Sequence, residues 1–163
     1  MIGIAAWRQV AGAILGSVLL AASGSAETAS AFTALGGTWS GGGHIRLEGG
    51  QREAIRCSAS YAPRSGGTAL GLSLRCASAS GRIELRANLQ SRGNRISGSW
   101  EERSYNVSGD VSGIAAGSNL RLLFSGSLSG AMLVTTSGNS QSISVRTDAS
   151  ALQGVNVSLR RAD

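Results

Sequence analysis

The chain has 163 residues, with 24 glycines, one proline and no lysine, and its 15 arginines against nine acidic residues give a net charge of +6. An apolar fraction of 42% supplies a core and argues against a disordered chain, while the glycines lack the three-residue period of collagen. The length fits one domain.

Residues 1–26 have the features of a secretory signal peptide. One positive charge, Arg8, precedes the uncharged run Val10 to Ala22, and small residues follow it. Cleavage is expected after Ala26 or after Ala31, and the run is shorter than the roughly 20 residues of a membrane-spanning helix. An uncleaved N-terminal anchor is the alternative. We therefore expect a periplasmic or secreted protein without a transmembrane span in its mature form, comprising a lead-in segment 27–36 and one domain, 37–163.

From Trp39 onward, apolar and polar residues alternate between clusters of Gly, Ser and Asn, which predicts short antiparallel strands and tight turns. The apolar positions are odd in residues 39–47 and 55–61, and even in 70–76. Placing Tyr61 opposite Leu72 also places Cys57 opposite Cys76. Two independent criteria thus predict the same register.

The next hairpin follows the same pattern around a turn at residues 91–94. Its alternation predicts Leu89 opposite Ile96, Ala87 opposite Gly98 and Leu85 opposite Trp100. Arg75 is expected beside Glu84 on the polar face, and Glu102 opposite Ile83. Further strands are expected at 107–114, 119–126, 131–136, 141–147 and 152–161, about ten in all, with no helix after the signal.

Short strands in sequence order favour an all-β, up-and-down antiparallel barrel of about 8–10 strands, because closure removes exposed sheet edges. An open two-sheet sandwich is the alternative. The two cysteines lie in the exported part and are expected to form a structural disulfide, Cys57–Cys76, since an oxidising compartment favours it. Glycines on the apolar face, Gly41, Gly43 and Gly98, would either relieve crowding between strands or leave room inside.

The segment Leu35-Gly36-Gly37-Thr38-Trp39 begins the first strand, and Arg160 and Arg161 end the last. This arrangement resembles the calycin superfamily of lipocalins and avidins, in which a Gly-x-Trp opens the barrel and an arginine of the final strand packs over the Trp. The resemblance implies a closed barrel with Trp39 and Arg160 at its floor, and it implies no particular ligand.

Few residues offer catalytic chemistry. His44 is the sole histidine and is expected on the polar face, which leaves a serine nucleophile without a base and a metal without partners. Glu101 and Glu102 are consecutive on a strand and point to opposite faces. Glu102 is expected at the rim or inside the mouth of the barrel. We therefore predict a protein that is not an enzyme and has no metal or cofactor.

Arginines dominate the predicted polar face, whereas the aromatic residues belong to the apolar face. Nucleic-acid binding usually places aromatic platforms beside the cations, so no nucleic-acid partner is expected. A soluble face or weak attraction to anionic envelope surfaces fits the charge better. The arginines concerned are Arg46, Arg56, Arg75, Arg82, Arg86, Arg95, Arg103 and Arg121.

The leading functional hypothesis is a non-catalytic exported barrel that holds a small, largely apolar ligand. A protein-binding module, such as an inhibitor or envelope-associated factor, is the second, and an outer-membrane barrel with its apolar face toward lipid is the third. Tyr61, Trp100 and Tyr105 are expected to line an entrance. The candidate ligand-binding residues are Tyr61, Ala87, Gly98, Trp100, Glu102 and Tyr105. Neither the ligand nor the oligomeric state follows from the sequence.

Overall fold

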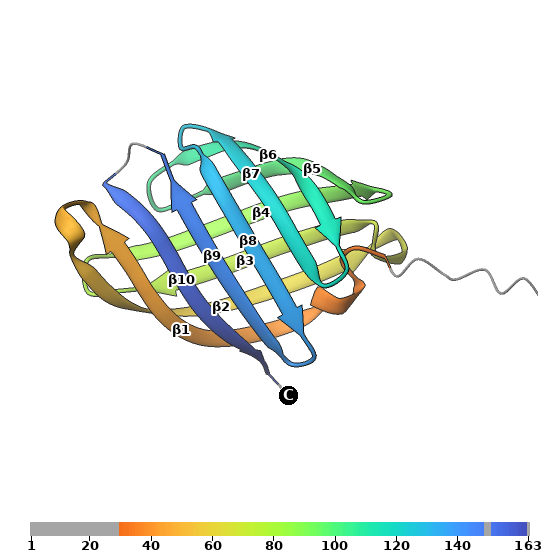
Figure 1. Ribbon diagram of the computed structural model, residues 1–163, viewed down its shortest axis with the longest axis horizontal. Helices are drawn as coiled ribbons and strands as arrows, with labels where there is room; N and C mark the ends of the chain where they lie inside the picture. Colours follow the sequence, from red (N-terminus) through yellow and green to blue (C-terminus); the bar gives the residue numbers. More distant parts are fainter. Residues whose placement is uncertain (1–29, 149–150, 163) are drawn as a thin grey trace, which may run out of the picture.

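The computed structural model describes residues 30–148 and 151–162, which form one closed antiparallel barrel (Figure 1). The expected signal peptide 1–26 and the beginning of the lead-in segment lie outside the described residues. Each strand pairs with its neighbours in the chain, and β1 also pairs with β10, so the sheet closes on itself. The up-and-down barrel is confirmed, and the open sandwich is wrong.

Ten strands and three short 3-10 turns make up the described chain. The turns are η1 (Thr33–Leu35), η2 (Glu48–Gly50) and η3 (Ser65–Gly67). The strands are β1 (Gly37–Leu47), β2 (Arg52–Arg64), β3 (Ala69–Ala77), β4 (Arg82–Arg92), β5 (Arg95–Glu102), β6 (Val107–Ala116), β7 (Asn119–Gly126), β8 (Gly130–Ser137), β9 (Ser140–Thr147) and β10 (Leu152–Arg161).

The register between β2 and β3 follows the sequence prediction. Tyr61 stands opposite Leu72, and Cys57 stands opposite Cys76 with a Cα–Cα distance of 4.1 Å and a disulfide between them. Both cysteines are buried among the inward-facing side chains. Successive residues of a strand point to opposite faces. One correct cross-strand pair therefore fixes which residues of both strands face the interior.

The register between β4 and β5 differs from the prediction by two residues. Leu89 pairs with Gly98, Ala87 with Trp100, and Leu85 with Glu102. The loop lies one residue later than expected: the predicted pairing leaves Arg92 and Gly93 between the strands, whereas Gly93 and Asn94 connect them. Gly93 has the positive φ of 61° that such a turn requires. A two-residue shift keeps every side chain on its face of the sheet. The residues predicted to face the interior were therefore correct, although the predicted cross-strand pairs were wrong.

Apolar side chains face the inside of the barrel, and mostly polar ones face outward. Arg75 and Glu84 form the expected exposed pair on the outer wall, with Nε and Oε1 3.9 Å apart. A lipid-embedded barrel has the opposite polarity, with an apolar band outside. The burial pattern therefore argues against the outer-membrane alternative.

The up-and-down order gives the barrel two distinct ends. At one end, which we call the η1 end, lie η1, the C-terminus of β10 and the connections β2–β3, β4–β5, β6–β7 and β8–β9. The other end, which we call the mouth, carries the connections β1–β2, β3–β4, β5–β6, β7–β8 and β9–β10. In Figure 1 the orange turn η1 marks the first end, and the β1–β2 connection marks the mouth.

Side chains of the lead-in segment seal the η1 end. Phe32 and Leu35 are 0% and 3% exposed, and the Trp39 indole, fully buried, donates a hydrogen bond from Nε1 to the Leu35 carbonyl at 2.8 Å. Arg161 lies 4.3 Å from the Trp39 ring centroid and donates to the carbonyl oxygens of Gly36 and Ala34.

The arginine over the tryptophan is therefore Arg161 and not Arg160. Arg161 pairs with Trp39 in the β1–β10 register and shares its face, whereas Arg160 pairs with Ser40 and is exposed on the outer wall. Strand alternation leaves only one of two consecutive arginines able to reach the ring. The cation over the ring also bonds the turn that precedes β1, so it ties both chain segments to the barrel floor.

Candidate ligand-binding site

The apolar lining of the mouth is open to solvent, although its side chains point inward. These residues are all partly buried, and they come from most of the strands and from one connection. The lining consists of Leu47, Leu74, Ile83, Leu85, Val107, Phe124, Leu128, Met132, Val145, Leu152 and Val155.

Inward side chains toward the η1 end are packed much more tightly. Leu70 and Leu159 are each 1% exposed, and Ile96 is 3% exposed. Even the polar Gln141 is buried there, where its amide donates to Thr136 Oγ1 at 3.2 Å. Exposure of the inward side chains therefore falls from the mouth to this packed layer, and we call the mouth half of the interior the chamber.

Trp100 forms part of the chamber wall near the end of β5. Its ring meets Phe124 edge to face with centroids 6.0 Å apart, and its Nε1 donates to the Ser125 carbonyl at 3.2 Å. Ala87 stands directly opposite Trp100 on β4 and is buried. The small Ala87 side chain accommodates the indole, and the hydrogen bond fixes the ring against the wall.

Glu102 is a buried carboxylate at the rim of the mouth. It accepts hydrogen bonds from the backbone N–H groups of Glu84, Ser104 and Tyr105, at 2.7, 3.0 and 2.7 Å. Desolvation raises the pKa of Glu102, but these hydrogen bonds outweigh it and lower the pKa below its usual value. The carboxylate thus links the β5–β6 connection to β4 through hydrogen bonds.

The three aromatic residues expected to line one entrance lie apart. Tyr61 belongs to the η1 end, where its ring meets Trp39 edge to face and its hydroxyl donates to Gln141 Oε1 at 2.7 Å. Burial raises the pKa of this phenol. Tyr105 is 65% exposed in the connection at the mouth. Only Trp100 of the three reaches the chamber, so the expected aromatic ring is wrong.

Inward glycines allow close approach of neighbouring strands and do not create the chamber. A Cβ at Gly98 would lie 2.1 Å from the Asn88 carbonyl oxygen, and one at Gly41 would lie 2.0 Å from that of Ser158. Gly43 is equally constrained, at 1.9 Å from the Asn156 carbonyl oxygen. Of the two roles considered for these residues, the structure supports relief of crowding.

Sequence reasoning missed most of the chamber's lining. Phe124, Met132 and Val145 all occupy inward positions of strands that were expected, yet none was named as a site residue. Their alternation was visible, but alternation cannot say which inward residues lie at an open end. That distinction needs the positions of the ends, which depend on how η1 seals one of them.

His44 faces outward on β1 and is exposed, as expected. Among the residues that the structure describes, no three His, Cys, Asp or Glu side chains gather as metal ligands. No helix within residues 30–148 and 151–162 is long and apolar enough to cross a membrane.

Comparison with known proteins supports the fold alone. No protein-family model matches the chain, and no curated protein matches it significantly. Among solved structures, the barrel is similar to that of Rv2717c from M. tuberculosis, with a TM-score of 0.62 and 16% sequence identity. The match covers 80% of this chain and 94% of the other. At this identity the likeness extends to a β-barrel architecture, and the calycin resemblance gains no family match.

Proposed function

We propose that the protein is an exported, non-catalytic β-barrel that holds a small, largely apolar molecule in the mouth half of its interior. One observation supports this most directly: the inward apolar side chains are more exposed toward the mouth than toward the η1 end. Water-exposed apolar surface inside a concavity gains free energy when an apolar ligand covers it.

Two polar groups expected as ligand contacts are already engaged within the protein, which favours an apolar occupant. The Glu102 carboxylate is occupied by backbone N–H groups, and the Trp100 N–H is bonded to the wall. A strongly polar ligand would lose hydration without finding partners among these groups. The disulfide is compatible with an extracytoplasmic location, where such bonds persist.

Native mass spectrometry of the mature protein from its host's exported fraction tests the proposal and identifies the ligand. The expected result is a reproducible adduct that disappears when the protein is unfolded. A monomer without an adduct, lighter only by the two hydrogens lost in the disulfide, would favour a protein-binding role over ligand binding.

A paired substitution locates binding within the molecule. Met132 faces the chamber, and its neighbour Leu133 faces outward and is 42% exposed. With the fluorescent apolar probe N-phenyl-1-naphthylamine, Met132→Trp is expected to weaken binding at least about tenfold by filling the chamber, whereas Leu133→Trp leaves it unchanged. Equal effects of the two variants, or no saturable binding to the wild type, would overturn the proposal.

A protein-binding module remains the second candidate, supported by apolar side chains on the outer wall. Ile114 and Leu133 both stand opposite Arg121 in their registers, and Leu123 lies two residues along the same strand. Their exposures are 41%, 42% and 61%. Recovery of one stoichiometric partner from the exported fraction, lost on Leu123→Ser, would favour this function over ligand storage.

A further inference from the structure

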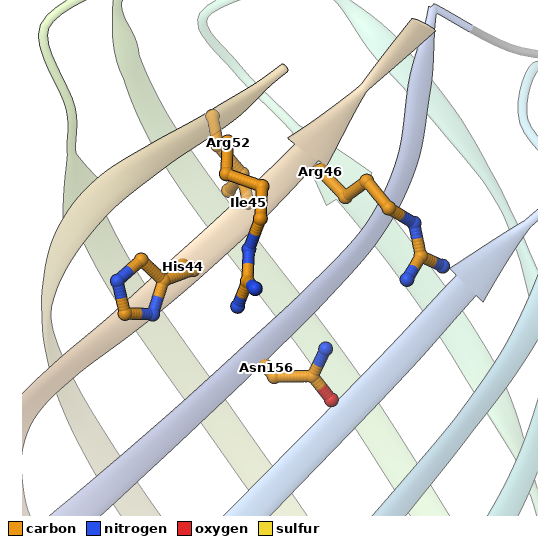
Figure 2. A pocket seen from close by; sticks show the side chains of 5 residues that line it. All are labelled: His44, Ile45, Arg46, Arg52 and Asn156. Atoms are coloured by element: carbon orange, nitrogen blue, oxygen red, sulfur yellow. The ribbon is translucent and has the colours of Figure 1, made fainter. Parts of the chain in front are cut away.

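A depression on the outer wall near the mouth is lined almost entirely by hydrogen-bond donors. It has a volume of about 150 Å³ and is formed by His44, Ile45 and Arg46 of β1, Arg52 of β2 and Asn156 of β10. Figure 2 shows the two guanidinium groups, the imidazole and the amide on one side of the sheet. All four polar side chains are exposed, so their donors remain available to a ligand.

Strand register explains why these side chains meet. Arg46 stands directly opposite Arg52, and His44 stands directly opposite Asn156. His44 and Arg46 are two residues apart and therefore share a face of β1. The four groups occupy two adjacent rows across three strands, which places them within reach of a single small ligand.

The opposed arginines lack a neutralising partner. Within residues 30–148 and 151–162, neither Arg46 nor Arg52 makes an ion pair or a side-chain hydrogen bond. The adjacent Glu53 carboxylate instead accepts from the backbone N–H and the hydroxyl of Ser80, at 3.1 and 2.7 Å. Like charges directly opposite each other on a sheet destabilise it, and a bound anion would remove this repulsion.

Gly154 leaves space for the Arg46 guanidinium beside the depression. It pairs with Arg46 on one side and with Arg146 on the other, next to a register shift in the β1–β10 ladder. A Cβ at this position would lie 3.2 Å from Arg46 Nη2 and 2.9 Å from the Val145 carbonyl oxygen. The glycine thus lets the guanidinium extend over β10, and it adds the exposed Arg146 to the same row.

We propose that this depression binds a phosphoryl group, either of a small phosphate compound or of the headgroup of a phospholipid with a net negative charge. Two guanidinium groups approach from different strands, and each offers paired N–H donors matched to phosphate oxygens. The Asn156 amide and a ring N–H of His44 add donors from the second row. A tetrahedral anion uses donors from several directions, whereas a planar carboxylate is satisfied by one guanidinium fork.

Titration with inorganic phosphate at constant ionic strength, followed by ¹H–¹⁵N NMR of the arginine Nε–H and asparagine amide signals, tests the site. The variant is Arg46→Gln with Arg52→Gln. The matched control is Arg92→Gln with Arg95→Gln, another directly opposed pair that lies at the η1 end and removes the same charge. All four side chains are exposed, so both variants are expected to fold.

The wild type and the control are expected to show saturable shifts at Arg46, Arg52 and Asn156. The Arg46/Arg52 variant is expected to bind at least about tenfold more weakly, as followed at Asn156. If phosphate affinity falls equally in the two double variants, the loss reflects net charge alone, and the proposal is overturned. Shifts that grow linearly without saturation in the wild type would overturn it as well.

Vesicle sedimentation distinguishes the two sources of the phosphoryl group. For a headgroup, the wild type and the control sediment with vesicles containing phosphatidylglycerol but not with pure phosphatidylcholine, and the Arg46/Arg52 variant stays in solution. For a small phosphate compound, none of the three sediments although the phosphate titration saturates. Binding of the apolar probe is expected to be the same in all three proteins, so failure of this site and failure of the chamber are separable.

Discussion

The two ends of the barrel are built from the same alternating strands but are stabilised differently. At the η1 end, Trp39, Phe32 and Leu35 are almost fully buried, and Arg161 bonds the lead-in segment across the floor. At the mouth, residues such as Leu85 and Val145 keep part of their surface in solvent. Packing therefore stabilises one end and leaves the other accessible, which is the division that ligand entry requires.

Local covalent and polar links hold the mouth where packing is weaker. The disulfide joins β2 to the C-terminal end of β3. Glu102 accepts hydrogen bonds from three backbone N–H groups, and Glu53 accepts hydrogen bonds from the β3–β4 connection. Such links fix the rim without filling the interior. The mouth is therefore stabilised by links within its wall, and the η1 end by packing of its core.

Trp39→Ala is expected to have the largest effect on stability, a loss of about 3–5 kcal/mol in the free energy of unfolding. The change leaves a cavity at the floor and removes both the hydrogen bond to the Leu35 carbonyl and the contact with Arg161. Urea denaturation followed by circular dichroism measures it. Leu47→Ala, an inward position at the other end of β1, is the control and should cost about 1 kcal/mol. Equal losses would mean that the two ends are stabilised alike.

Loss of the disulfide comes next. Cys57→Ser with Cys76→Ser frees a link that spans 19 residues, and the unfolded chain gains conformational freedom worth about 3 kcal/mol. Denaturation of the double variant should show this loss. Proteolysis should also cut first in the connections of the mouth, because this link lies in that half of the wall. First cuts at η3 or at η1 would contradict the assignment of the disulfide to the mouth.

Sequence patterns were informative where side-chain alternation or cysteine pairing constrained the answer. They predicted the closed barrel, the β2–β3 register and the outward position of His44. They failed at the β4–β5 register because apolar alternation is unchanged by a two-residue shift, and only the Gly93–Asn94 turn distinguishes the two pairings.

The candidate site was harder to predict than the fold, because its position depends on contacts between distant segments. Phe32 lies in the lead-in segment, five residues before β1 begins at Gly37. Nothing in the local sequence shows that its side chain closes the floor of the barrel. Once that end is sealed, the other end becomes the mouth, and Met132 and Val145 become its lining. The depression around Arg46 likewise joins residues that are more than one hundred positions apart.

A pair of substitutions on β8 compares the two ends within one strand. Val134 is 5% exposed, whereas Met132, two residues closer to the mouth, is only partly buried. Val134→Ala should cost about 2 kcal/mol and Met132→Ala below about 1 kcal/mol, although methionine loses more atoms. The same denaturation experiment measures both. A larger loss for Met132 would show that the chamber is filled by its own side chains.

Glu102→Gln is expected to cost about 1 kcal/mol at neutral pH, because the amide oxygen retains part of the hydrogen bonding. Since the pKa of Glu102 is lowered in the folded protein, its contribution is complete above the unfolded-state pKa of about 4.3 and is lost as the pH falls through the folded-state pKa. The difference in stability between wild type and variant should therefore be constant near neutral pH and shrink in acid. Glu101→Gln on the outer face is the matched control, with little expected change. A difference that persists unchanged in acid would show that the substitution acts through packing at the rim and not through the carboxylate's charge.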